Sequence, residues 1–173
     1  QGDNLTPIDI VECVAGFGTW VKSKTLNPTV VVGRDGRMSG PMVSQISIQT
    51  LLSMGINVID LDLSTTPTVE MYVCHVNADA GIIFTASHNP KEWNALKLLN
   101  EDGEFISAET GARVLELAAK EEFVFASVDK LGTVIADDSY GQLHIDAILQ
   151  YPLVNKSAIA NQNCKVVVDA INS

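Results

Sequence analysis

Ser87 and His88 are the residues whose types and placement most suggest chemistry. They follow the continuous apolar run 82–84, which predicts a strand buried on both faces. Ligands of open α/β sheets bind outside the carboxyl ends of the strands, so a serine here is placed as an exposed nucleophile. No GxSxG motif is present, so a hydrolase triad is not indicated. Asn89 and Asn94 are expected to fix the loop by side-chain hydrogen bonds. The alternative is an ordinary turn, because Ser, His, Asn and Pro are common turn residues.

Arg34 and Arg37 form a second polar group, in a glycine-rich loop that also follows a predicted strand, 29–32. The chain has only three arginines, and two of them lie in this loop. Their guanidinium groups could brace the loop that contains Ser87 or complement a phosphate on it. The alternative is a structural ion pair with Asp35 or another carboxylate of the loop.

Helical and strand patterns alternate along the chain. Helices are indicated by capping residues, first-turn prolines and apolar spacing, and strands by β-branched or alternating runs. The predicted helices are 6–24, 39–54, 67–76, 107–120 and 140–151, and the predicted strands are 29–32, 57–63, 80–85, 95–99, 104–106 and 165–168. This order predicts an α/β fold, a layered α/β/α domain with a mixed, mainly parallel sheet. The last two strands before 107 are too close for a crossover, so we expect a hairpin and one antiparallel edge strand.

Composition excludes several classes of function. The chain carries 11 Lys+Arg against 21 Asp+Glu, a net charge of −10, whereas proteins that bind nucleic acid or anionic membranes need a basic face. No run approaches the roughly 18 apolar residues of a membrane span. The cysteines Cys13, Cys74 and Cys164 lack CxxC spacing, which favours the reducing cytosol and a cytoplasmic protein. Neither Cys74-His75 nor His144 has metal-ligand spacing.

The end of the sequence predicts a domain boundary. Residues 165–168 have the pattern of a buried strand, yet no helix follows to cover it. We therefore expect residues 1–160 to form one domain and residues 161–173 to be the first strand of a truncated second domain. The chain starts at Gln1 in place of an initiator methionine, which likewise favours a fragment of a longer protein.

Two longer motifs carry a resemblance to a known family. The first is TASHNP at 85–90, followed by Asn94 and Lys97 in KEWNALK at 91–97, and the second is VVGRDGRMSG at 31–40. In these motifs and their order the chain resembles the α-D-phosphohexomutase superfamily, which includes phosphoglucomutase, phosphomannomutase and phosphoglucosamine mutase. The resemblance spans essentially the whole chain, mostly the first domain of that family.

The resemblance implies an isomerase that shifts phosphate between the 1- and 6-hydroxyls of a hexose phosphate through a sugar bisphosphate. Ser87 is the position that would become the phosphoserine. Lys97 is the implied general acid/base and charge stabiliser, and His88 is implied to assist binding or proton transfer. The alternatives are a solvated strand lysine and a histidine that orders the loop. The motifs do not choose among glucose, mannose and glucosamine phosphates.

The resemblance also implies Mg²⁺ as cofactor and a sugar bisphosphate as activator. Only the phosphate of Ser87 would ligate the metal from this chain, because the family's aspartate-rich loop belongs to the second domain. The family's N-terminal segment with its active-site arginine is expected before Gln1, and its sugar- and phosphate-binding loops belong to domains III and IV. The implied partners are a hexose phosphate and domains II to IV. The alternative function is an isolated structural or anion-binding α/β module without activity.

Overall fold

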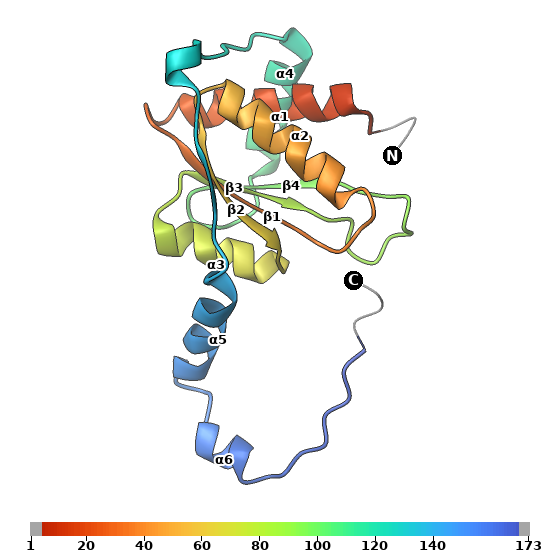
Figure 1. Ribbon diagram of the computed structural model, residues 1–173, viewed down its shortest axis with the longest axis vertical. Coiled ribbons are helices and arrows are strands. Elements are labelled where there is room, and N and C mark those ends of the chain that lie inside the picture. Colours follow the sequence, from red (N-terminus) through yellow and green to blue (C-terminus); the bar gives the residue numbers. More distant parts are fainter. Residues whose placement is uncertain (1–4, 170–173) are drawn as a thin grey trace.

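The computed structural model describes residues 5–169, which fold around a five-stranded sheet (Figure 1). The strand order is β4-β3-β1-β2-β5. β1 pairs in parallel with β2 and β3, β2 pairs in parallel with β5, and β4 runs antiparallel to β3 at one edge. The strands are β1 (Thr29–Arg34), β2 (Asn57–Leu63), β3 (Ala80–Phe84), β4 (Leu96–Leu99) and β5 (Val134–Ala136). The predicted mixed, mainly parallel sheet with one antiparallel edge strand is confirmed.

Helices cover both faces of the sheet within the described residues (Figure 1). The helices are α1 (Pro7–Lys22), α2 (Gly40–Ser53), α3 (Thr66–Val76), α4 (Ala108–Lys120), α5 (Tyr140–Gln150) and α6 (Lys156–Ala160). Side chains of β1 alternate between two cores: Val30 and Val32 pack with α1, α2 and α4, whereas Val31 packs with α3. The predicted α/β/α layering is therefore confirmed. None of these helices has both the length and the hydrophobicity needed to cross a membrane.

The helix starts follow from short capping motifs. At α1 the Thr6 hydroxyl accepts from the Asp9 N–H, and the Asp9 carboxylate accepts from the Thr6 N–H, which together form a capping box. At α4 the Ser107 hydroxyl accepts from the Thr110 N–H at 3.1 Å. These caps bind backbone N–H groups that the helix itself cannot pair, so the sequence places both helix starts correctly.

Three elements of the described chain lie outside the predicted set: β5, α6 and a short 3₁₀ helix, η1 (Val128–Lys130). β5 has three residues, each exposed, and pairs with β2. Its place depends on β2 and on Thr133, whose N–H and hydroxyl both donate to the Asn57 side chain. Such a strand lacks an alternating pattern of its own, which is why the sequence did not indicate it.

The hairpin predicted after β4 forms, but its second strand, 104–106, does not. Leu99 and Phe105 make an isolated bridge, and the Ile106 N–H donates to the Leu98 carbonyl at 3.0 Å. The segment then enters the cap of α4, so it is too short for a ladder. The antiparallel edge of the sheet comes from the pairing of β4 with β3.

The strand predicted at 165–168 is wrong for the described residues. Val166, Val167 and Val168 are 76%, 94% and 81% exposed and form no strand. In Figure 1 this segment runs back up from α6 toward the level of the sheet, separate from it, with no strand beside it. A strand is stabilised by hydrogen bonds to a neighbour, so the valine pattern alone does not produce one. The division at residue 160 stays a prediction, and residues 170–173 lie outside the described part.

Gly103 closes the turn after β4 with a positive φ of +72°, and a Cβ there would clash with the carbonyl oxygen of Glu70. Gly103→Ala is therefore expected to lower the free energy of unfolding by about 2 kcal/mol or more. Gly141→Ala is the matched control, because nothing lies within 4 Å of a Cβ at that helical position. Urea unfolding of both variants checks this, and equal midpoints would contradict the clash.

Candidate functional site

A cleft of about 550 Å³ lies at the carboxyl ends of β1, β2 and β3. Each of these strands ends in a loop that contributes to the lining, and the first residues of α3 and α5 complete it. Lining residues include Arg34 at the end of β1 and Asp35 after it, Ser64 and Thr65 after β2, Ser87 after β3, and Tyr140 of α5. This is the position at which open α/β sheets bind ligands.

Ser87 reaches the cleft from the loop of residues 85–95, called the serine loop below. Its backbone has a left-handed φ of +55°, and its N–H donates to the Thr85 hydroxyl at 3.0 Å. The Ser87 Oγ lies 3.3 Å from the His88 Nδ1, and both residues are exposed. The tight turn therefore presents a hydroxyl, with an imidazole beside it, at the end of a fully buried strand.

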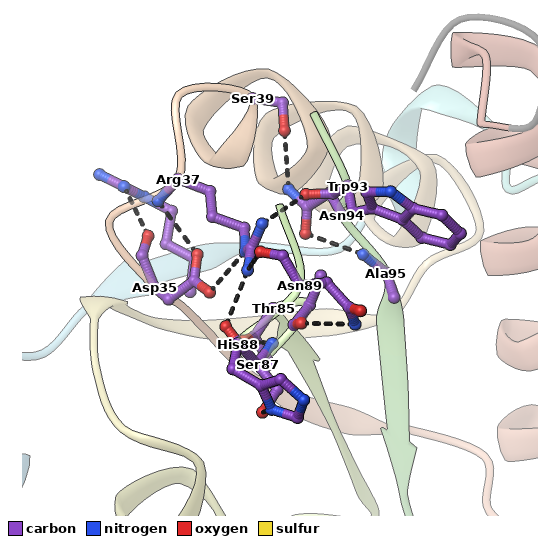
Figure 2. Close-up of polar contacts among 12 residues, drawn as sticks. Asp35, Arg37, Ser39, Thr85, Ser87, His88, Asn89, Trp93, Asn94 and Ala95 are labelled. Atoms are coloured by element: carbon purple, nitrogen blue, oxygen red, sulfur yellow. Dashed lines mark hydrogen bonds and ion pairs between the residues drawn. The ribbon is translucent and has the colours of Figure 1, made fainter. Parts of the chain in front are cut away.

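Arg37 binds the serine loop from outside (Figure 2). Its Nη1 donates to the carbonyl oxygens of Pro90 and Trp93 at 2.8 and 2.9 Å, and its Nη2 donates to those of Ser87 and Asn89 at 2.7 and 2.8 Å. A single guanidinium thus holds four carbonyls of one loop. The loop's shape therefore depends on this side chain.

Asp35 orients that guanidinium. Its carboxylate accepts from the Arg37 Nε at 3.2 Å and from the Arg37 backbone N–H at 3.0 Å. Arg37 thus braces the serine loop and also forms an ion pair with Asp35, so the two interpretations of this residue hold together. The Asp35 N–H donates to the Phe84 carbonyl, which joins the ends of β1 and β3.

The two asparagines predicted to fix the serine loop make side-chain hydrogen bonds within and beside it. Asn89 Nδ2 donates to the Ala86 carbonyl at 2.9 Å, inside the loop. Asn94 is buried, and its Nδ2 donates to the Ser39 hydroxyl at 3.0 Å (Figure 2). Asn94 therefore links the serine loop to the residues that precede α2.

Arg34 lies inside the cleft and has a different role from Arg37. Its Nη2 is 2.6 Å from the Asp62 carboxylate, and its Nη1 donates to the Asp35 carbonyl at 3.3 Å. The Arg34 side chain is only 16% exposed, whereas that of Asp62 is 66% exposed. Arg34 is the basic residue among the described residues that line the cleft.

Lys97 is not among the residues that line this cleft. It lies on β4 opposite Ile83, and its Nζ is 5.7 Å from the centre of the Phe105 ring. Directly paired residues of antiparallel strands face the same side of a sheet, so Lys97 shares the side of Ile83, which does line the cleft. The structure thus brings Ser87, His88 and Arg34 together and leaves the Lys97 ammonium group one strand away.

Tyr140 is a cleft residue that the sequence analysis missed. Its hydroxyl donates to the Leu63 carbonyl at 2.6 Å. Burial raises the pKa of Tyr140, and the negative charges of Asp62, Asp138 and Asp60 raise it further. The phenol therefore stays protonated and acts as a hydrogen-bond donor.

Ser64 and Thr65 were missed as well, although a signal for them exists. They follow β2 as Ser87 follows β3. The strand-end rule, that ligands of open α/β sheets bind outside the carboxyl ends of the strands, therefore applies to both loops. The Ser64 Oγ is buried without a hydrogen-bond partner among the described residues, while Thr65 caps α3. The apolar pattern of 57–63 predicted the strand, but the loop after it has no longer motif like those that drew attention to the loops after β1 and β3.

Metal-binding side chains are not gathered in the described part of the chain. No group of three or more His, Cys, Asp or Glu residues within 5–169 could hold a metal ion. Asp35 is engaged by Arg37, and Asp62 by Arg34. The residues present therefore do not build a magnesium site by themselves.

The serine at a strand end, within a layered α/β domain, has clear relatives. Residues 1–125 match the family model for phosphoglucomutase/phosphomannomutase, alpha/beta/alpha domain I. The chain therefore belongs to the α-D-phosphohexomutase superfamily, as its first domain, which confirms the resemblance found in the sequence.

Individual relatives agree with this assignment. The chain is 38% identical over 171 residues to a phosphoglucomutase/phosphomannomutase of Thermococcus kodakarensis, covering 98% of this chain and 37% of the relative. It is 37% identical over 152 residues to a phosphoglucosamine mutase of Limosilactobacillus fermentum, covering 87% and 32%. It thus spans about a third of the length of these curated relatives.

A solved structure shows the same fold. The crystal structure of a phosphoglucomutase/phosphomannomutase family protein from Burkholderia thailandensis superposes with a TM-score of 0.75 at 23% identity. The match covers 87% of this chain and 33% of that protein. At this identity the comparison supports the fold alone.

Proposed function

We propose that this chain is the serine-bearing first domain of a phosphohexomutase, which interconverts hexose 1-phosphate and hexose 6-phosphate. The observation that carries the proposal is Ser87, exposed at the end of a buried strand and facing a cleft that contains Arg34, in a chain of this family. A phosphoserine at this position stores a transferable phosphoryl group, and the cleft provides room for an acceptor.

The reaction consists of two phosphoryl transfers. In the first, the bond between phosphorus and the Ser87 Oγ breaks, and this oxygen takes up a proton to become a hydroxyl. Phosphorus bonds to the free hydroxyl oxygen of the sugar phosphate, whose proton passes to a base. In the second, the sugar bisphosphate has turned end for end. The Ser87 hydroxyl then attacks the other phosphoryl group and loses its proton, and the departing sugar oxygen takes one up. The serine is phosphorylated again, so phosphate and charge balance over the cycle.

His88 and Lys97 are the proposed proton-handling residues. His88 Nδ1, 3.3 Å from the Ser87 Oγ, is close enough to take part in transfers at that oxygen. Lys97 is proposed as acid/base for the sugar hydroxyl, by resemblance to the family. That role requires the ammonium group to move from the Phe105 ring toward the cleft.

Mg²⁺ is proposed for the full-length protein. When bound, it would neutralise charge on the transferring phosphoryl group. Its aspartate ligands are proposed to lie outside this chain, so no step above passes through the metal. The other domains of the parent protein are proposed to supply the sugar-binding contacts.

The test uses the full-length protein that carries this chain. We expect mass spectrometry of the intact protein and of its peptides to place a phosphate on Ser87. We also expect mutase turnover on at least one of glucose, mannose and glucosamine phosphates, with Mg²⁺ and a sugar bisphosphate present. A protein with no phosphoserine and no turnover on any of the three would support the alternative, an anion-binding or structural module.

A further inference from the structure

The two arginines beside Ser87 differ in how many hydrogen-bond donors they have left. A guanidinium has five N–H donors. Arg37 uses all five: one to the Asp35 carboxylate and four to carbonyl oxygens of the serine loop. The Arg37 side chain is 10% exposed, so it is enclosed as well as saturated. Arg37 therefore has no donor to offer a phosphoryl group.

Arg34 has donors to spare. Its contacts within the described chain use Nη2, toward Asp62, and Nη1, toward the Asp35 carbonyl at the long distance of 3.3 Å. The remaining N–H groups have no partner among residues 5–169, and the side chain lines the same cleft as Ser87. Arginine binds phosphate through two parallel hydrogen bonds, and three free donors allow that geometry.

The charges around the cleft make a cation necessary there. A phosphoserine brings about −1.5 to −2 charges at neutral pH. Asp60 and Asp62 lie close enough to raise the pKa of Tyr140 through their negative charges. Asp35 also lines the cleft, but Arg37 neutralises it. Without a further cation, the carboxylates of Asp60 and Asp62 would repel a phosphate dianion bound in this cleft.

Asp62 is an easily displaced partner for Arg34. Its carboxylate is largely exposed, so solvent screens its attraction to the Arg34 guanidinium. Asp62 also has a left-handed φ of +48°. A phosphate dianion carries more charge than a carboxylate and offers more acceptor oxygens, so it competes well for the same guanidinium.

We propose that Arg34 binds the phosphoryl group on Ser87, and that Asp62 is the counter-ion that Arg34 exchanges for this group when Ser87 is phosphorylated. This inference rests on the proposed function and assigns separate tasks to two neighbouring arginines: Arg37 shapes the loop and Arg34 holds its phosphate. Ser64 supports the assignment, since its buried hydroxyl has no hydrogen-bond partner in the described part of the chain and Ser64 lines the same cleft.

The test is ³¹P NMR titration of the phosphorylated full-length protein. The second pKa of an exposed phosphoserine is about 6, and a nearby guanidinium lowers it. Arg34→Gln is expected to raise the measured pKa of the phosphoserine by about one unit and to lower kcat about tenfold. Arg34→Lys keeps a cation and is expected to recover most of the pKa effect. Asp62→Asn is expected to lower the pKa of the phosphoserine below that of the wild type.

Arg113→Gln is the matched control, because Arg113 lies on α4 and pairs with Glu116, away from the cleft. It should leave the phosphoserine pKa unchanged. If the wild type is phosphorylated and its phosphoserine pKa equals that of Arg34→Gln, the role of Arg34 is overturned while the proposed function stands. A wild type without phosphate on Ser87 would overturn the proposed function, and the role of Arg34 with it.

Discussion

Ser87→Ala in the full-length protein is expected to lower mutase turnover by at least about 10³-fold, the scale of losing a covalent catalytic group. The substitution removes the oxygen that accepts and donates the phosphoryl group in both halves of the proposed cycle. Folding should change little, because Ser87 is exposed and the only hydrogen bond of its Oγ within residues 5–169 is to the His88 ring. Steady-state assays, intact-mass measurement and thermal unfolding of the same samples check the three statements.

A glycine at the same position separates chemistry from backbone strain. Ser87 has a φ of +55°, which glycine adopts freely, so Ser87→Gly should be inactive yet at least as stable as Ser87→Ala. Ser127→Ala is the control, since Ser127 precedes a short 3₁₀ helix, η1 (Val128–Lys130), and is not among the residues that line the cleft. Full turnover in Ser87→Ala, with phosphate on another serine, would reduce Ser87 to a turn residue.

The sequence predicted most helices and central strands because their signals are local. Caps such as Thr6 and Ser107 and the apolar run of β3 carry the information within a few residues. The sequence did not predict β5, because the position of this strand depends on its pairing with β2, which is distant in the chain. At residues 165–168 the sequence predicted a strand that does not form. The valines have strand propensity but no strand to pair with in residues 5–169.

The site was predicted in part for the same reason. The strand-end rule identified the Ser87 and Arg34 loops, and both lie at the cleft. Which arginine braces the loop and which faces the cleft depends on side-chain directions that the sequence does not encode locally. Tyr140 is absent from the prediction because α5 reaches the cleft by packing against α3, a tertiary contact.

Arg37→Lys is expected to lower turnover by about 10²-fold or more, although it preserves the charge. The ammonium group has three donors and no planar fork, so it cannot hold the four carbonyl oxygens of the serine loop together with the Asp35 carboxylate. Ser87 would then lose its fixed position, and a displacement of about 1 Å at a reacting group can cost about 10²-fold. Turnover measurements and hydrogen exchange of the serine-loop amides check both parts.

The stability of Arg37→Lys should also fall, by about 2 kcal/mol, since charge-assisted hydrogen bonds to several carbonyls are lost at once. The loss should be confined: exchange should rise in residues 85–95, while the amides of β1 and β3 remain protected. Arg113→Lys is the control, because Arg113 pairs with Glu116 on the surface of α4. Normal turnover with an unprotected serine loop would mean that the loop closes only on substrate, and Arg37 would then be a structural brace without influence on the position of Ser87.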